Sequence, residues 1–237
     1  MAPLSLAGAE TKKQLYRIIT IEREYGCGAG EIARQIAERL QWQLWDHALT
    51  EAIARLAKVD HAAVVRCEER ADSTFRKLVN TFLRGSYESH MSAPGKEPFN
   101  PDRFVAVGQQ VMESAANAGN CVIVGRGAPY FLRERGDAFH VFLYASHPEK
   151  MRRLKLLGKT EKEAERLLDH IDRDRIEFVK CYFNADWPTR SLYHMMINTA
   201  MGDETVISII LETMHALERS AAGGVPPSHS SEPIPSR

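Results

Sequence analysis

A glycine-rich loop at residues 25–31, of sequence YGCGAGE, carries the strongest chemical signal in the chain. Gly26, Gly28 and Gly30 alternate in it, and glycine lets the backbone take positive φ angles and bring its N–H groups close to a ligand. A helix that begins at the loop would add a favourable dipole for an anion. The pattern favours a phosphate cradle built from backbone groups. The alternative is a tight strand-to-helix turn that needs glycine only for its geometry.

The loop lacks the two side chains that complete a Walker A motif, GxxxxGK[ST]. In that motif the Lys reaches the terminal phosphates and the hydroxyl binds Mg²⁺. In this register Arg23 stands in place of the first Gly, while Gly28 is kept. Ala29 replaces the Lys, and Gly30 replaces the Ser or Thr. Positive charge at the site must therefore come from other residues, and Arg23, just before the loop, is a candidate.

The segments around the loop predict the elements that hold it. Ile18, Ile19 and Ile21 form a short β-branched run, typical of a buried strand. Over residues 32–40, apolar residues recur at helical spacing, and charged residues occupy the outward face. The loop is therefore expected to join a buried strand to an amphipathic helix.

Further strands and helices alternate along the rest of the chain. The predicted strands are 43–46, 121–124, 139–144 and 193–198. The predicted helices are one around Leu49 to Leu56 and those at 60–84, 102–115, 147–155, 160–180 and 203–217. Alternation of this kind predicts an α/β fold, with a parallel sheet of about five strands in three α/β/α layers. Residues 85–101, rich in Gly, Pro and Ser, are interpreted as a mobile flank of the site.

Two arginines occupy positions where a phosphate is expected. Arg126 lies between two glycines directly after the strand at 121–124, at the carboxyl edge where open α/β sheets bind ligands. It is either a phosphate contact or a surface residue. Arg175 falls on the apolar stripe of the helix at 160–180, where a buried charge needs an anionic partner. That partner is either Asp172, at i−3, or a bound phosphate.

Charge and composition limit the partners. The 237 residues suit one domain, and 31 basic residues balance 31 acidic ones, so no global field attracts nucleic acid or a membrane. No apolar run has the length of a membrane span, and the first ten residues have no basic signal-peptide region. We expect a cytoplasmic protein with a flexible N-terminus (1–15), one domain (16–219) and a disordered tail (220–237). The sequence leaves the oligomeric state open.

The cysteines predict no metal site. Residues 27, 67, 121 and 181 are dispersed and form no CxxC pair, so zinc and a disulfide framework are not expected. Cys27 lies inside the glycine loop, where a helix N-terminus could lower its thiol pKa and raise its reactivity. The favoured interpretation is a small loop residue that stands in for Ser or Ala.

Several motifs in order resemble the cytidylate kinase-like group of P-loop proteins over about residues 16–217. They are ITIEREYGCGAGEIARQIAERLQWQLWD, CVIVGRG, FLYASHPEKMRRL, DRDR and INT. The resemblance implies a P-loop kinase core with an acceptor-side helical insert at about 60–101 and an arginine-bearing helical lid at about 150–185. It also implies transfer of the γ-phosphoryl of ATP to a nucleoside monophosphate or similar small acceptor, with Mg²⁺.

The resemblance carries site residues over to this chain. The expected catalytic residues are Arg126, Arg153, Arg173 and Arg175. The expected nucleotide-binding residues are Arg23, Gly26, Cys27, Gly28, Ala29, Gly30 and Glu31. Cytidylate kinases have Lys at the position of Ala29 and Thr at that of Glu31, and the Asp of their GRD motif is Gly127 here. A nucleotide-binding or regulatory protein with a degenerate loop is therefore the alternative function.

Overall fold

The computed structural model describes residues 15–46, 48–49, 52 and 101–222. The predicted helix at 60–84, most of the helix around Leu49 and most of the 85–101 loop lie outside the described residues, as does almost all of the predicted N-terminal segment.

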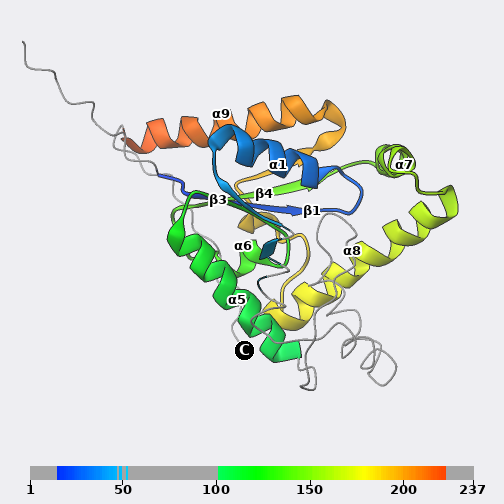
Figure 1. Cartoon of the computed structure of the whole chain (residues 1–237), viewed down its shortest axis with the longest axis horizontal. Coiled ribbons are helices and arrows are strands. Elements are labelled where there is room, and N and C mark those ends of the chain that lie inside the picture. The colour runs from blue at the N-terminus through cyan, green and yellow to red at the C-terminus, as the bar shows by residue number, and fades with distance from the viewer. Residues whose placement is uncertain (1–14, 47, 50–51, 53–100, 223–237) are drawn as a thin grey trace, which may run out of the picture.

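Five parallel strands form one sheet in the order β2-β3-β1-β4-β5, which confirms the predicted α/β fold (Figure 1). The strands are β1 (Ile18–Arg23), β2 (Gln43–Trp45), β3 (Cys121–Val124), β4 (Ala138–Tyr144) and β5 (Met195–Asn198). The strand β1 lies in the centre, between β3 and β4, and its six residues are all buried. A central parallel strand is covered on both faces, which explains its continuous apolar character.

Helices cover both faces of the sheet (Figure 1). Helices α1 (Ala29–Leu40) and α9 (Asp203–Ala222) pack on one face. Helices α5 (Pro101–Ala118), α6 (Ala128–Phe131) and α8 (Glu161–Phe183) contribute to the core on the other face. Helix α7 (His147–Leu156) follows β4 and packs against α8. Two 3₁₀ turns, η1 (Arg190–Leu192) and η2 (Thr199–Met201), flank β5.

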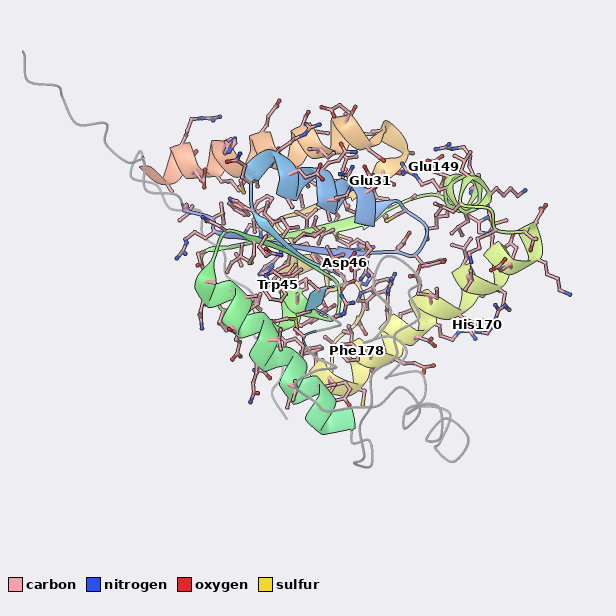
Figure 2. The ribbon with its side chains drawn as sticks, viewed as in Figure 1. Glu31, Trp45, Asp46, Glu149, His170 and Phe178 are labelled. Carbon is pink, nitrogen blue, oxygen red and sulfur yellow. The ribbon has the colours of Figure 1, made fainter. Side chains whose placement is uncertain are left out.

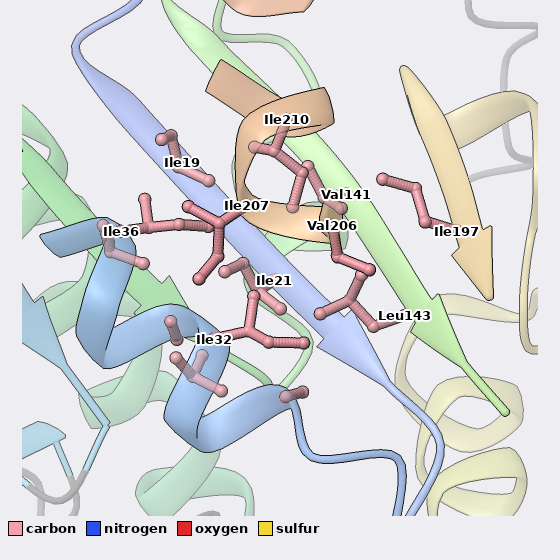
Figure 3. Packing of buried hydrophobic residues seen from close by; sticks show 14 of the residues in the cluster. Ile19, Ile21, Ile32, Ile36, Val141, Leu143, Ile197, Val206, Ile207 and Ile210 are labelled. Atoms are coloured by element: carbon pink, nitrogen blue, oxygen red, sulfur yellow. The ribbon is translucent and has the colours of Figure 1, made fainter. Parts of the chain in front are cut away.

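The core beneath α1 and α9 fixes the start of the glycine loop. Ile19 and Ile21 of β1 lie in one buried cluster with Ile32 and Ile36 of α1 and with Val206 of α9 (Figure 3). The apolar stripe predicted from the spacing in 32–40 is therefore the face that α1 turns to the sheet. Because β1 and α1 are both fixed by this cluster, the loop between them is held at both ends.

The start of α8 agrees with the sequence prediction, whereas the end of α9 and the presence of α6 differ from it. Helix α8 begins after Thr160, whose hydroxyl accepts a hydrogen bond from the N–H of Glu163, as the capping pattern predicts. Helix α9 runs to Ala222, three residues into the predicted tail, and the rest of that tail lies outside the described residues. The short helix α6 is not foreseen. None of the described helices is both long and apolar enough to cross a membrane.

Candidate phosphate-binding site

The glycine loop lies at the carboxyl edge of the sheet, where β1 and β3 end side by side. Helix α1, which follows β1, packs on one face, and α6, which follows β3, packs on the other (Figure 1). Neighbouring parallel strands whose following helices go to opposite faces leave a crevice between them, and this crevice is the usual ligand site of open α/β sheets.

The loop itself presents free backbone donors. Gly26 and Gly28 have φ angles of 78° and 84°, and Gly28 is the N-cap of α1. The N–H groups of Gly26, Cys27, Gly28 and Gly30 donate to no acceptor among the described residues. Free N–H groups at the start of a helix are suited to bind phosphate oxygens. This geometry supports the anion site over a turn that needs glycine for its shape alone.

Distant elements hold the loop in place. The buried hydroxyl of Thr199, in η2, donates to the carbonyl oxygen of Cys27 at 2.7 Å. The N–H of Tyr25 donates to Oδ1 of Asp172, on α8, at 2.8 Å. The N–H of Glu24 donates to the carbonyl oxygen of Leu143, in β4, at 2.9 Å. The loop is therefore fixed by side chains and backbone groups from three other parts of the chain.

Arg153, on α7, lies directly against the loop. A Cβ added at Gly28 would be only 2.1 Å from Nη1 of Arg153. Nε donates to Glu149 at 2.8 Å, and Nη2 donates to Asp203 at 2.7 Å and to the carbonyl oxygen of Thr199 at 3.2 Å. Nη1 makes no hydrogen bond with a described residue. Two of the three guanidinium nitrogens are thus fixed, and the third faces the glycine loop.

The charge of Arg153 is stabilised by its carboxylate partners. Burial on its own would lower the pKa of Arg153, but the bonds to Asp203 and Glu149 outweigh this effect and raise the pKa. Bonds from Arg152 and Arg153 lower the pKa of Glu149 to about 2. Glu149 therefore stays ionised at neutral pH, and the guanidinium of Arg153 keeps its orientation.

Arg175 pairs with Asp172, which is one of the two partners that the sequence left open. Its Nη1 donates to Asp172 at 2.8 Å and to the carbonyl oxygen of Arg23 at 2.7 Å. Burial, followed by the nearby charge of Arg23, lowers the pKa of Arg175. Lys150 lies 2.6 Å from Glu24 and 3.7 Å from Asp172, so a network of charges joins α7 and α8 to the end of β1.

Arg23, the last residue of β1, and Arg126, two residues after β3, lie at the carboxyl edge of the sheet. Nη1 of Arg23 is 3.3 Å from Oε1 of Glu22, and Nη1 of Arg126 is 3.5 Å from Oδ1 of Asp46, at the end of β2. Both arginine side chains are buried. Burial is the main cause that lowers the pKa of Arg126 to about 10. The nearby charge of Asp46 opposes this shift, and that of Arg23 adds to it. Arg126 is therefore not a surface residue, and its contact with a phosphate stays a prediction.

Two predicted site residues lie apart from this group. Arg173 is exposed on α8 and bonds to none of the described residues. Glu31, on α1 (Figure 2), accepts hydrogen bonds from Arg34 and Gln35, and the bonds from Arg34 and then Gln35 lower its pKa to about 2. The side chain of Glu31 is therefore engaged on the surface of the helix, away from the loop that precedes it.

Cys27 is a buried structural residue. Its Sγ donates to the carbonyl oxygen of Leu143 at 3.6 Å, and burial raises its pKa to about 11. The hypothesis of a lowered pKa is wrong, because desolvation of the thiolate exceeds the effect of the helix N-terminus. The favoured interpretation, a small loop residue, agrees with this burial.

Some residues of the site were not found from the sequence. Glu149, Asp203, Lys150 and Thr199 hold the loop or its arginines, and none of them was singled out for this role. The available signals were the INT motif, which ends at Thr199, and the FLYASHPEKMRRL motif, which contains Glu149 and Lys150. Among the described residues, no three His, Cys, Asp or Glu side chains gather as a metal site.

The fold and the glycine loop together define a protein of the P-loop kinase class. The chain belongs to the cytidylate kinase-like family, whose model matches residues 18–201. An uncharacterised protein from Eubacterium ventriosum has a similar structure, with a TM-score of 0.60 and 19% identity over 84% of this chain and 98% of its own. Shikimate kinase from Bacteroides thetaiotaomicron gives a TM-score of 0.50 and 18% identity, again over 84% and 98%. The comparison with curated proteins found no match.

Proposed function

We propose that the protein binds ATP on the glycine loop and moves its γ-phosphoryl to a nucleoside monophosphate or a similar small acceptor, with Arg153 in the role of the missing Walker lysine. The single observation that supports this assignment is the orientation of the Arg153 guanidinium. Nε and Nη2 are held by Glu149 and Asp203, while Nη1 faces Gly28 beside free N–H donors. A fixed cation at a phosphate cradle is what the degenerate loop otherwise lacks.

Phosphoryl transfer depends on positioning and on charge stabilisation more than on covalent chemistry by the protein. The N–H groups of the loop would bind the phosphate oxygens, and Arg153 would neutralise charge that develops on the transferring group. Because the arginine is held before the ligand arrives, little reorganisation is needed during the reaction. Arg173, exposed on α8 and not engaged by a described residue, is the lid arginine that could close on the phosphates.

Family membership makes Mg²⁺ the expected metal, and a bound ion would neutralise charge on the phosphates. Proteins usually hold Mg²⁺ through one or two carboxylates together with substrate phosphates and water. The described residues form no cluster of three metal ligands, and Glu31 replaces the hydroxyl that cytidylate kinases have there. The phosphates of the nucleotide and water would therefore supply most of the ligands of the ion.

A second function has one observation in its favour. Arg175, the other lid arginine, is occupied by Asp172 and by the backbone of Arg23. A nucleotide-binding or regulatory protein without turnover would tolerate both the engagement of Arg175 by protein groups and the replacement of the Walker lysine by Ala29. The two functions differ in one measurable respect, which is the release of ADP.

The test is an ADP-release assay over a panel of nucleoside monophosphates, with the wild-type chain and two arginine variants. Arg153→Gln should lose about 10²- to 10³-fold in turnover, the usual effect of removing one group that stabilises transition-state charge. Arg219→Gln, a matched control that removes an exposed guanidinium from α9, should keep wild-type turnover. ATP binding without ADP release on any acceptor would favour the regulatory function. Equal turnover in wild type and Arg153→Gln would contradict the role of Arg153.

A further inference from the structure

One carboxylate of α8 contacts the glycine loop directly. Oδ1 of Asp172 accepts hydrogen bonds from the N–H of Tyr25 at 2.8 Å and from Nη1 of Arg175 at 2.8 Å. Its other oxygen, Oδ2, lies 3.7 Å from Nζ of Lys150, on α7. A backbone N–H of the loop, a guanidinium and an ammonium group thus surround a single carboxylate. These three kinds of donor are also the ones with which proteins bind phosphate oxygens.

The N–H group that Asp172 engages belongs to the same row as the donors that face a phosphate. Tyr25 directly precedes Gly26 in the loop. The N–H groups of Gly26, Cys27 and Gly28 donate to no acceptor among the described residues. Successive N–H groups before a helix suit an anion. The carboxylate of Asp172 therefore lies at one end of the candidate phosphate site.

The two helices that supply these groups pack closely on the loop. A Cβ at Gly26 would lie 3.3 Å from Cβ of Lys150, on α7, and 3.4 Å from Cδ2 of Leu168, on α8. Tyr25 packs against a small buried cluster that contains residues of both helices. Because α7 and α8 are in contact with the loop and with each other, the bonds of Asp172 tie the position of α8 to that of the loop.

The charges around Asp172 cancel. Lys150 also contacts Glu24, with Nζ 2.6 Å from Oε2. Arg175 also donates to the carbonyl oxygen of Arg23 at 2.7 Å. Two cations, Lys150 and Arg175, thus face two carboxylates. A phosphate that enters beside this group meets a carboxylate of like charge, and the two anions compete for the same donors.

We propose that Asp172 is an inhibitory latch: its carboxylate occupies a phosphate position on the loop, and a phosphate of ATP must displace it. This inference rests on the proposed function and adds a regulatory contact to the same site. When the carboxylate leaves, the N–H of Tyr25 and the cations Lys150 and Arg175 become available to the phosphates, and α8 loses a tie to the loop. A ligand that must first displace a group of the protein binds more weakly than it would without that group.

The test is a calorimetric titration of ATP, with Mg²⁺ present, into the wild-type chain and into Asp172→Asn. Asparagine has a similar shape and no charge. The ATP affinity should rise about 5- to 50-fold, within the usual range of coupling between two binding events. The same substitution should lower the melting temperature, because buried Arg175 loses the charge of its partner. A purely structural role of Asp172 would lower the melting temperature without any gain in ATP affinity, and that result would overturn the latch.

Asp169→Asn is the matched control. Asp169 is exposed on α8, three residues before Asp172, so this substitution removes the same charge from the same helix and keeps the contact with the loop. Because solvent screens an exposed charge, the ATP affinity should stay within about twofold of wild type. An equal gain of affinity in Asp169→Asn and Asp172→Asn would mean that general charge repulsion limits binding, and would overturn the latch.

Displacement of the carboxylate has a signal of its own. In a ¹⁵N-tyrosine-labelled chain, the amide resonance of Tyr25 is identified by its loss in Tyr25→Phe. This resonance should differ between wild type and Asp172→Asn before ATP is added, because the partner of the N–H differs. Saturation with ATP should bring the two resonances together, because the N–H then donates to a phosphate in both chains. A difference that persists at saturation would mean that Asp172 stays in place, and would overturn the latch.

A second pair of variants protects the test against loss of folding. If Asp172→Asn is unfolded at the assay temperature, Arg175→Gln is compared with the double variant Arg175→Gln/Asp172→Asn. The double variant removes both charges of the pair, so neither is left without its partner. Its ATP affinity should exceed that of Arg175→Gln by about 5- to 50-fold. Equal ATP affinity within the pair overturns the latch and leaves the proposed function intact, whereas absence of ATP binding by the wild type and every variant overturns both.

Discussion

Replacement of Gly28 by alanine should separate Arg153 from the glycine loop. A Cβ at residue 28 would lie 2.1 Å from Nη1 and 2.9 Å from Cζ of Arg153, so the guanidinium must move. The φ angle of 84° adds a backbone cost of about 1–2 kcal/mol for an L-residue. Loss of one charge-assisted hydrogen bond to a phosphate is worth about 1.5–3 kcal/mol. ATP affinity, measured by calorimetry, should therefore fall about 10- to 150-fold.

Gly158 provides a matched control for the backbone cost. Its φ angle is 82°, and a Cβ at this position would meet no atom within 4 Å. Gly158→Ala should therefore lower the melting temperature to an extent similar to that in Gly28→Ala, while ATP affinity stays at the wild-type value. Equal loss of ATP affinity in the two variants would mean that strain, and not the displacement of Arg153, causes the effect.

A double-mutant cycle tests whether the new methyl group acts through Arg153. If it does, Gly28→Ala added to Arg153→Gln should cause little further loss, because the displaced group is already absent. If the methyl group blocks the phosphate directly, the two losses should multiply. Wild-type ATP affinity in Gly28→Ala, or fully multiplicative losses in the cycle, would refute the reasoning.

Three further predictions concern the residues that hold the site. Thr199→Val should lower the free energy of unfolding by about 1–3 kcal/mol in a denaturant titration, because it leaves the buried carbonyl of Cys27 unpaired. Asp172→Ala should cost about 3–5 kcal/mol by the same measurement, because it removes a carboxylate partner of buried Arg175. Burial raises the pKa of the Cys27 and Cys121 thiols from 9.0 to about 11. The unfolded chain therefore releases these protons first, and the free energy of unfolding should fall between about pH 9 and pH 11, by about 1.4 kcal/mol per pH unit for each thiol.

Controls for these variants come from the same elements. Thr205→Val and Asp169→Ala replace exposed side chains on α9 and α8, and each should change the free energy of unfolding by less than about 0.5 kcal/mol. In the double variant Cys27→Ala/Cys121→Ala, the free energy of unfolding should depend less on pH, once the contribution of the tyrosines has been subtracted. An unchanged slope would contradict the role given to the thiols, and a Thr199→Val variant as stable as wild type would contradict the anchoring of the loop.

The strands of the sheet could be predicted because the sequence signals for them are local. Cys121–Val124 and Ile18–Ile21 are short continuous apolar runs, and strands buried on both faces require such runs. The capping of α8 by Thr160 was predictable for the same reason, since the cap and the N–H donor of Glu163 are three residues apart. Helix α6 had no comparable signal. This helix follows three consecutive residues whose backbone is in the left-handed region. One of them is Arg126, with a φ angle of 56°, and sequence rules do not place an arginine in that region.

The site was predictable where its parts are close in sequence and not where they are distant. Asp172 as a partner of Arg175 follows from helical spacing. The bond of Arg153 to Asp203 joins residues 50 apart, and that of Thr199 to Cys27 joins residues 172 apart. Spacing rules contain no information on such pairs, because only the packing of α7, η2 and the loop brings them together. Spacing rules likewise do not show that Nη2 of Arg23 is buried without a hydrogen-bond partner among the described residues.

The most direct test of the central claim is a calorimetric titration of ATP, with Mg²⁺ present, into the wild-type chain and into Arg153→Gln. We expect about one ATP to bind per wild-type chain, and the variant to bind ATP at least about tenfold more weakly. No ATP binding by the wild type would mean that the glycine loop is a turn without a ligand, and the proposed function would then be wrong. Equal affinity in the two chains would leave the loop as a nucleotide site but contradict the assignment of Arg153 as its cation.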